Sequence, residues 1–325
     1  MKVFITGGAG FIGSHLCEQL LARGDEALIL DDLSTGAMEN LEPFVGRRGF
    51  SYRIGSATDA PLVGECVDRC DVTVHLAAAV GVRLIVERPV HTIETNVRAT
   101  EVVLAAAAKK QRPVLIASTS EVYGKGSKVP FSEDDDLTLG ATAHSRWAYA
   151  CSKALDEWLA LAYLREKRVP VIVVRFFNTV GPRQTGRYGM VLPNFAAQAL
   201  RGQPITVYGT GEQSRCFGHV RDAVEAVVRL LRTPAASGQV VNVGNDEEVT
   251  IEELARRVRD AAGSASPIVK IPYGEAYAEG FEDMKRRVPD LRRLEALTGF
   301  RPRTPLSAII QDVLADQRAR LPAHP

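Results

Sequence analysis

Short apolar runs alternate with helical patterns of hydrophobic residues through the first half of the chain. The apolar runs lie at 3–6, 27–30, 72–76, 114–117 and 171–176, and are typical of strands buried on both faces. The helical patterns lie at 14–23, 95–110 and 147–167. This alternation predicts an α/β fold with a doubly wound, parallel, Rossmann-type sheet and crossover helices on both of its faces.

The regular spacing ends after about residue 176. Prolines and glycines recur there and indicate short strands joined by loops. A helical pattern at 219–232 and an apolar run at 239–243 return to the sheet, and Thr250 with Glu253 predicts a capping box before a further helix. The acidic run at 133–136 is interpreted as a solvated loop. We therefore expect a Rossmann domain over 1–175 plus about 216–245, and a smaller C-terminal α/β domain over about 176–215 and 246–325.

Charge and cysteine content narrow the class of protein. The chain has 40 basic and 39 acidic side chains, so no overall field attracts nucleic acid or a membrane surface. No apolar run approaches about 18 residues, and no signal-peptide pattern precedes the first strand. The five cysteines are odd in number and include no C-x-x-C, which favours reduced thiols in a cytoplasmic protein. No cluster of His, Cys, Asp and Glu in the sequence indicates a metal site.

A glycine pattern between the first predicted strand and the first predicted helix is typical of a dinucleotide site. Gly7, Gly10 and Gly13 permit a tight turn and let a pyrophosphate approach the N-terminus of the helix. Asp31 ends the second strand, where a carboxylate binds ribose hydroxyls and repels a 2′-phosphate. The pattern therefore predicts NAD rather than NADP. Asp32 is also interpreted as a cap of the following turn.

A tyrosine and a lysine stand four residues apart in the helical pattern at 147–167. Tyr149 and Lys153 therefore share one helix face, and a nearby ammonium favours the phenolate form of tyrosine. Such a tyrosine acts as a base near neutral pH, and beside a hydride acceptor it indicates oxidation of an alcohol. The competing interpretation is a tyrosine whose ring only packs and a lysine that is solvated.

Together with these motifs, His75-Leu76-Ala77-Ala78, Asn96 and Thr119 resemble the extended short-chain dehydrogenases/reductases, or NAD-dependent epimerase/dehydratase family. The resemblance covers nearly the whole chain. Members similar to this chain are 4-epimerases, 4,6-dehydratases and glucuronate decarboxylases of nucleotide sugars. They share one opening step, in which NAD+ removes a hydride from C4 of the sugar while tyrosine takes the O4 proton.

The resemblance implies a role for each matched residue. Tyr149 would be the base, Lys153 would hold the nicotinamide ribose and lower the tyrosine pKa, and Thr119 would hydrogen-bond O4. His75 is expected to be a buried strand-end histidine. Ser56 stands where members usually carry an aspartate at the adenine. The implied cofactor contacts are Gly7, Gly10, Phe11, Ile12, Gly13, Asp31, Asp32, Ser34, Thr35, Gly36, Ser56, Ala57, Leu76, Ala77, Ala78, Asn96, Tyr149, Lys153 and Phe176.

The second half resembles the family's domain for a nucleotide-diphosphate sugar. Asn178 is the implied diphosphate ligand, and Tyr208 would stack near the uracil. Arg215 and Arg287 would bind phosphate oxygens, for which a guanidinium fork is suited. The implied substrate is a UDP-sugar, and the full set of implied contacts is Arg83, Asn178, Arg187, Tyr208, Arg215 and Arg287.

The triplet Thr119-Ser120-Glu121 bears on the fate of the sugar after oxidation at C4. A 4,6-dehydratase carries aspartate where Ser120 stands, and Glu121 is out of place in a typical 4-epimerase. The similar decarboxylases carry the same triplet before Val-Tyr-Gly. Oxidation of UDP-glucuronate at C4 gives a β-keto acid, and Ser120 with Glu121 would manage the enolate and its reprotonation. We therefore expect a UDP-glucuronate decarboxylase that forms UDP-xylose. The alternatives are a UDP-sugar 4-epimerase, a sugar-nucleotide dehydratase, a non-catalytic dinucleotide sensor, and a purely structural Glu121.

Relatives often form homodimers through two helices of each subunit, which match 95–110 and 147–167 here. A homodimer is therefore expected. The apolar stripes of these two helices could form the subunit interface, but they could equally belong to the core, because both helices must cover the sheet. Their apolar members are Val102, Val103, Leu155, Trp158, Leu159 and Ala162.

Overall fold

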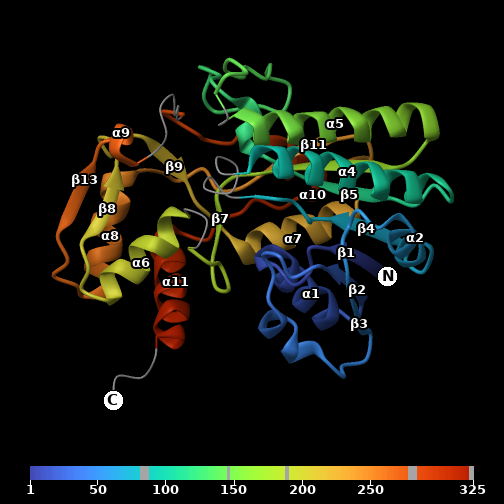
Figure 1. The fold of residues 1–325 in the computed structure, drawn as a ribbon, viewed down its shortest axis with the longest axis horizontal. Coiled ribbons are helices and arrows are strands. Elements are labelled where there is room, and N and C mark those ends of the chain that lie inside the picture. Colours follow the sequence, from blue (N-terminus) through green and yellow to red (C-terminus); the bar gives the residue numbers. More distant parts are fainter. Residues whose placement is uncertain (81–87, 145–146, 187–189, 277–283, 322–325) are drawn as a thin grey trace.

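A seven-stranded parallel sheet forms the centre of the protein in a computed structural model that describes residues 1–80, 88–144, 147–186, 190–276 and 284–321 (Figure 1). The strand order is β11-β6-β5-β4-β1-β2-β3, which reverses direction next to β1 as in a doubly wound fold. The predicted fold class is confirmed. The strands are β1 (Lys2–Thr6), β2 (Glu26–Asp31), β3 (Phe50–Ile54), β4 (Val72–His75), β5 (Val114–Thr119), β6 (Val171–Phe176) and β11 (Val240–Val243).

Helices cover both faces of this sheet, so the central strands are apolar on both sides. One face packs against α1 (Phe11–Ala22), α7 (Val220–Leu231) and α10 (Arg292–Thr298). The other packs against α2 (Ala60–Asp68), α4 (Pro89–Ala108) and α5 (Ala148–Lys167). The predicted helices are confirmed, although α4 begins at Pro89 instead of 95. Its first turns expose Val90 and Ile93, so they lack the amphipathic pattern that would have revealed them.

Three further helices pack on one another beside the central sheet, at the left of Figure 1. They share an apolar core with short two-stranded pairs: β8 with β13, β9 with β12, and β7 with β10. The helices are α6 (Val191–Leu200), α8 (Ile251–Ala262) and α11 (Leu306–Arg320), and the four-residue α9 spans Tyr273–Ala276. The short strands are β7 (Thr179–Val180), β8 (Ile205–Tyr208), β9 (Ser214–Cys216), β10 (Gly218–His219), β12 (Glu248–Thr250) and β13 (Ile268–Ile271).

The predicted cap of α8 is confirmed in one of its two halves. The Thr250 hydroxyl accepts a hydrogen bond from the backbone N–H of Glu253 at 3.1 Å. The Glu253 carboxylate instead pairs with Arg256 and Arg257 on the same helix. The side chain of Thr250 therefore begins the helix, and helix-spaced ion pairs engage the glutamate.

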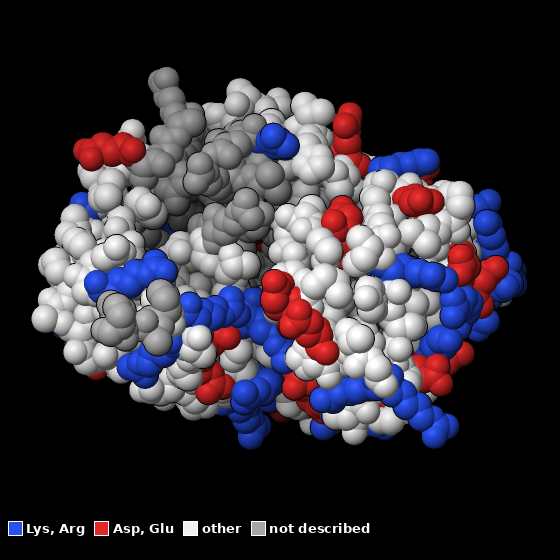
Figure 2. Space-filling model, turned by 60° about the horizontal axis from the view of Figure 1, so that its bottom comes forward, with Lys and Arg blue, Asp and Glu red and all other residues white. Residues whose placement is uncertain are grey.

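The surface carries both signs of charge in close proximity. Figure 2 shows one face on which basic and acidic side chains lie next to one another rather than in separate fields. Within the described ranges, no helix is long and apolar enough to cross a membrane.

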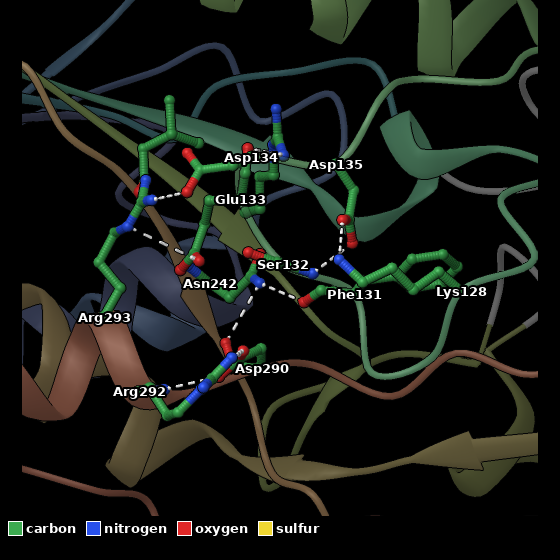
Figure 3. Close-up of polar contacts among 12 residues, drawn as sticks. Lys128, Phe131, Ser132, Glu133, Asp134, Asp135, Asn242, Asp290, Arg292 and Arg293 are labelled. Atoms are coloured by element: carbon green, nitrogen blue, oxygen red, sulfur yellow. Dashed lines mark hydrogen bonds and ion pairs between the residues drawn. The ribbon is translucent and has the colours of Figure 1, made fainter.

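Asn242 of β11 joins three segments that are distant in sequence (Figure 3). Its Oδ1 accepts a hydrogen bond from the Tyr123 hydroxyl at 2.7 Å, and its Nδ2 donates to the carbonyls of Phe131 and Asp290 at 2.9 and 3.2 Å. Its backbone N–H donates to the Glu133 carboxylate at 2.8 Å. The loop after β5 and the 288–290 segment are thereby fixed to the central sheet.

The acidic run at 133–136 is only partly the solvated loop that we expected. Glu133 is buried because it accepts that backbone N–H and lies 3.8 Å from the Arg293 guanidinium. Burial raises the pKa of Glu133, and the backbone hydrogen bond opposes this rise. Asp134 and Asp136 are exposed, as expected. The exception arises because the run packs on β11, which the sequence pattern does not reveal.

Replacing Asn242 with leucine is expected to lower the free energy of unfolding by about 3 kcal/mol. The change removes three buried hydrogen bonds, one from the Tyr123 hydroxyl and two to the carbonyls of Phe131 and Asp290, and each such bond contributes about 0.5–1.5 kcal/mol. Urea unfolding measures the effect. The exposed Gln203 serves as a control, and Gln203→Leu should change the value by less than about 0.5 kcal/mol. Equal unfolding midpoints for Asn242→Leu and wild type would contradict a stabilising role for the Asn242 hydrogen bonds.

Candidate active site

A cavity of about 710 Å³ opens where the central parallel strands end. Its walls come from the loops that follow the carboxyl ends of β1 to β6, the usual ligand position in an open α/β sheet. The residues predicted from sequence that line it are Gly7, Gly10, Phe11, Ile12, Gly13, Asp31, Asp32, Ser34, Thr35, Ser56, Ala57, Leu76, Ala77, Ala78, Thr119, Ser120, Glu121, Tyr149, Phe176, Asn178 and Arg287.

The glycine-rich loop has no room for side chains. Gly7 has φ +72°, and a Cβ there would lie 2.7 Å from the backbone N of Ala77. A Cβ on Gly13 would lie 2.3 Å from the Gly7 carbonyl oxygen. The N-cap residue Gly10 makes no side-chain cap, and the first turn of α1 carries no acidic residue. The N-terminal N–H groups of α1 can therefore receive an anion such as a pyrophosphate.

Asp31 joins the glycine-rich loop to the loop after β2. Its two carboxylate oxygens accept hydrogen bonds from the backbone N–H groups of Ala9 and Leu33, at 2.9 and 2.8 Å. Burial raises the pKa of Asp31, and these two bonds oppose the rise. Asp32 accepts from the backbone N–H of Ser34, so the predicted turn cap is confirmed. Both carboxylates line the cavity and would repel a 2′-phosphate.

A phenol, hydroxyls, a carboxylate and a guanidinium line the same cavity. Tyr149 lies in the first turn of α5 and is only 7% exposed. Thr119, Ser120 and Glu121 follow β5, where the Thr119 hydroxyl accepts the Glu121 N–H at 3.2 Å and begins a short 3₁₀ helix. This combination can exchange a proton with a sugar hydroxyl and bind an anionic group beside it.

Arg287 is adjacent to two of these residues. Its Nη1 donates to Ser120 Oγ at 3.2 Å and lies 3.7 Å from Glu121 Oε1. Arg287 is 7% exposed, so its charge acts in a partly desolvated site. The expected phosphate contact of Arg287 stays a prediction. The structure shows in addition that Arg287 lies beside the Thr119-Ser120-Glu121 triplet.

Lys153 and Asn96 lie behind the cavity wall and do not line it. The Lys153 ammonium is 2.7 Å from Asp156 Oδ2. The Asn96 side chain accepts from the Ala79 N–H at 2.7 Å and donates to the Ala79 carbonyl and Ser152 Oγ at 3.3 Å. Asn96 therefore fixes the loop after β4 to α5. The predicted cofactor contacts of both residues remain predictions.

His75 is a buried strand-end histidine, as predicted. Its Nδ1 lies 2.7 Å from the Thr6 hydroxyl. Burial, reinforced by the nearby Lys153 charge, lowers the pKa of His75 to about 3. The ring is therefore neutral at physiological pH.

Of the predicted substrate residues, Arg215 and Tyr208 lie outside the cavity. Asn178 lines it and donates to the Cys216 carbonyl at 2.9 Å. Arg215 is buried, and its Nη1 donates to the Ser214 and Met284 carbonyls at 2.8 Å. Tyr208 is 41% exposed on β8. Gly36 is not among the lining residues either, and a Cβ there would lie 2.8 Å from Asp31 Oδ1. Arg83 and Arg187 lie outside the described residues.

Further polar or sulfur-bearing side chains line the cavity and were missed by sequence reasoning. They come mainly from the start of α4 and from the segment after β7, where no periodicity or motif marks them. Gln184 is buried and donates to the Thr179 carbonyl at 3.1 Å. In the part of the chain that the structure describes, no group of three or more His, Cys, Asp or Glu could hold a metal ion. The missed residues are Thr58, Arg88, His91, Thr95, Ser118, Thr179, Gln184, Thr185 and Met190.

Comparison with known proteins gives consistent matches over nearly the whole chain. A model of the NAD dependent epimerase/dehydratase family matches residues 3–244. The chain is 42% identical to a UDP-N-acetyl-alpha-D-glucosaminuronate decarboxylase of Bacillus cytotoxicus, over 93% of this chain and 92% of the relative. It is 36% identical to UDP-glucuronic acid decarboxylase 1 of Xenopus tropicalis, over 94% of this chain and 69% of that protein.

The fold is also similar to solved structures. One is a UDP-glucuronic acid 4-epimerase from Bacillus cereus in complex with UDP-glucuronic acid and NAD, with TM-score 0.88 and 25% identity over 98% of this chain and 99% of that chain. Another is a UDP-glucose 4-epimerase from Thermotoga maritima with UDP-glucose, with TM-score 0.88 and 26% identity over the same shares.

Proposed function

This chain belongs to the NAD-dependent epimerase/dehydratase family, and from that premise we propose that it decarboxylates a UDP-hexuronate through a transient 4-keto sugar. The observation that carries the proposal is the grouping of Ser120, Glu121 and Arg287 on the cavity wall that also bears Tyr149. The two relatives named as decarboxylases support it. UDP-glucuronate is the substrate that we expected from sequence, and the 42% identical relative adds its 2-acetamido form as a second candidate.

The cofactor is NAD, and the residues at the cavity fit it. The glycine-rich loop and the N-terminus of α1 would hold the pyrophosphate. Asp31 and the loop after β2 would bind the adenosine ribose, and Ser56 and Ala57 would contact the adenine. When bound, NAD+ would supply a hydride acceptor for C4 of the sugar and, in its reduced form, a hydride donor, so that the overall reaction would involve no net redox change.

Tyr149 and Thr119 would act on the O4 hydroxyl. Tyr149 would take the O4 proton during oxidation at C4, and its burial keeps water from competing for that proton. The Thr119 oxygen already accepts the Glu121 N–H, so its own proton remains to donate to O4. This hydrogen bond stabilises the charge that develops on O4 in the keto and enolate forms.

Arg287 and Glu121 would act at the substrate carboxylate. The guanidinium attracts the carboxylate into the site, and the adjacent Glu121 carboxylate opposes a tight ground-state pair, which favours departure of neutral carbon dioxide. The C5–C6 bond breaks, its electron pair passes to the C4–C5 enolate, and a proton returns to C5. We assign that proton transfer to the Ser120 and Glu121 pair.

A UDP-hexuronate 4-epimerase is the second candidate. The Bacillus cereus structure, which is similar over nearly the whole chain, is named as a UDP-glucuronic acid 4-epimerase. Epimerisation needs the C4 chemistry of Tyr149 and Thr119 but no group acting at C5, and it leaves Glu121 with a structural role.

Product mass separates these functions. Purified protein is incubated with UDP-glucuronate and, separately, with UDP-N-acetylglucosaminuronate, without added reductant. A product lighter by one carbon dioxide supports the decarboxylase, and the faster substrate identifies the group at C2. An unchanged mass with a new sugar supports the epimerase, and a loss of water supports a dehydratase. If the protein turns over no nucleotide sugar, the remaining interpretation is a non-catalytic dinucleotide sensor.

We also propose a homodimer formed through the outer faces of α4 and α5. Leu155 and Trp158 are 46% and 61% exposed on α5, and Val90 and Ile93 are exposed on α4. Exposed large apolar side chains on two helices that pack against each other favour a second subunit as their cover. Val102 and Val103 belong to the core instead, because they pack against the sheet.

Trp158→Glu is expected to convert the dimer to a monomer, because it places a charge at the centre of the buried interface. Sedimentation equilibrium measures the mass. Tyr52→Glu, on the exposed edge strand β3, is the control and should leave the dimer intact. A monomeric wild-type protein, or a dimeric Trp158→Glu variant, would refute the interface.

We likewise propose that the chain is divided into two domains and that the protein is cytoplasmic. The Rossmann domain would span 1–175 plus about 216–245 and bind NAD, and the segments at about 176–215 and 246–325 would bind the nucleotide sugar. The separate apolar core around α6, α8 and α11 supports this division. A cytoplasmic location is supported by the five cysteines, all of which are free thiols.

A further inference from the structure

Behind the cavity wall, the ammonium of Lys153 is bound by a carboxylate on its own helix. Lys153 Nζ and Asp156 Oδ2 are 2.7 Å apart, and their side chains are 3% and 0% exposed. Tyr149, Lys153 and Asp156 are spaced i, i+4 and i+7 and therefore lie on one face of α5. The charge that acts on the Tyr149 phenol is thus the charge of a buried ion pair rather than of a lysine alone.

We infer that Asp156 is a positioning residue for the catalytic base: it holds the Lys153 ammonium, offsets its charge, and thereby sets the pH at which Tyr149 gains its proton. A lone ammonium beside a phenol favours the phenolate. A carboxylate on the other side of that ammonium weakens the effect and also restrains the ammonium from moving toward the phenol. Asp156 touches neither the cavity nor Tyr149 in the described contacts, so it acts through Lys153.

The other groups around this pair leave Asp156 as the carboxylate that balances Lys153. Glu157, next on α5, is engaged by the Arg175 guanidinium at 2.7 Å. Thr100 of α4 faces Asp156 with a hydroxyl, and His75 of β4 is near Lys153 but neutral. Burial raises the pKa of Asp156, and the Lys153 ammonium opposes this rise.

The inference rests on the proposed function in one respect only, the use of Tyr149 as the base that oxidises O4. That step is common to decarboxylation and to 4-epimerisation. The test therefore remains valid with whichever of these two turnovers the wild-type protein performs.

The experiment is the pH dependence of kcat for Asp156→Asn, assayed with saturating UDP-hexuronate and NAD. Tyr149 must be deprotonated to accept the O4 proton, so activity falls as pH drops through the pKa of Tyr149. Removal of the carboxylate leaves the ammonium uncompensated, which favours the phenolate. The fall in activity at low pH, called the acid limb of the profile, therefore moves to lower pH. For charges about 10 Å apart at an effective dielectric of about 20, the expected shift is about one pH unit.

Two matched variants make the result specific. Glu166→Gln removes an exposed carboxylate from the same helix and should leave the acid limb at the wild-type pH. Asp156→Glu keeps the charge and should also keep the limb close to the wild-type pH. Should Asp156→Asn not fold, Asp156→Ala removes the same charge, leaves room for water, and is expected to give the same shift.

The outcomes separate the inference from the proposed function. An active wild type whose acid limb coincides with that of a folded Asp156→Asn or Asp156→Ala variant overturns the role of Asp156 alone. A uniform loss of kcat without a shifted limb has the same meaning, because it indicates a merely structural carboxylate. A wild type that turns over no nucleotide sugar overturns the proposed function.

Discussion

Tyr149→Phe is expected to lower kcat for carbon dioxide release by about 10³-fold, within the range of about 10²–10⁴-fold for loss of a general acid–base group. The change removes one hydroxyl from a buried ring that lines the cavity, so the ring still fills its space and the fold should be preserved. Binding of the UDP-sugar, measured by calorimetry, should change little because the binding contacts lie elsewhere. The substitution should therefore lower kcat and leave the Kd of the UDP-sugar nearly unchanged.

Tyr163→Phe provides the matched control, because Tyr163 lies on the same helix but does not line the cavity. It should retain wild-type activity. A Tyr149→Phe variant that keeps more than about a tenth of the wild-type kcat would remove Tyr149 from the chemistry, since proton transfer would then be carried by another group.

Arg287→Met is expected to weaken UDP-glucuronate binding and turnover by at least about 30-fold in kcat/KM. Truncation of one partner of a buried charge pair costs about 2–5 kcal/mol. Without the guanidinium, Glu121 would face the substrate carboxylate as an uncompensated like charge. The measurement compares UDP-glucuronate with UDP-glucose, which has no carboxylate.

This comparison separates the two roles considered for Arg287. A carboxylate contact predicts that binding of UDP-glucose changes little, whereas the phosphate clamp expected from sequence predicts equal losses for both ligands. Arg292→Met is the control, because Arg292 lies in the same segment but is exposed and pairs with Asp290. Equal losses for UDP-glucose and UDP-glucuronate would reject the carboxylate role.

The sheet and the cofactor loop could be predicted because their signals are local. Each central strand is a continuous apolar run, since it is buried on both faces, and the glycine pattern at 7–13 leaves no room for side chains. Tyr149 and the Thr119-Ser120-Glu121 triplet were found in the same way, by type and spacing. All of these residues line one cavity.

The remaining site features depend on contacts between distant segments. Arg287 meets Ser120 across 167 residues, and neither residue alone indicates the other. Glu133 looks like a solvated carboxylate in the sequence, yet it is buried where β11 brings the Asn242 N–H to it. Lys153 and Asp156 are only three residues apart on α5, and what the sequence does not reveal is that packing buries both side chains of the pair. Such partnerships appear only once α5, β11 and the 284–290 segment are placed together.

Decarboxylation can be measured directly from the fate of the substrate's carboxyl carbon. UDP-glucuronate and UDP-N-acetylglucosaminuronate labelled at the C6 carboxyl are each turned over by wild-type protein with NAD and no added reductant. If the protein is a decarboxylase, then for at least one of these substrates the label leaves as carbon dioxide in equal amount to the UDP-pentose formed, and Tyr149→Phe abolishes both. Retention of the label in a nucleotide sugar of unchanged mass would contradict decarboxylation and identify a 4-epimerase.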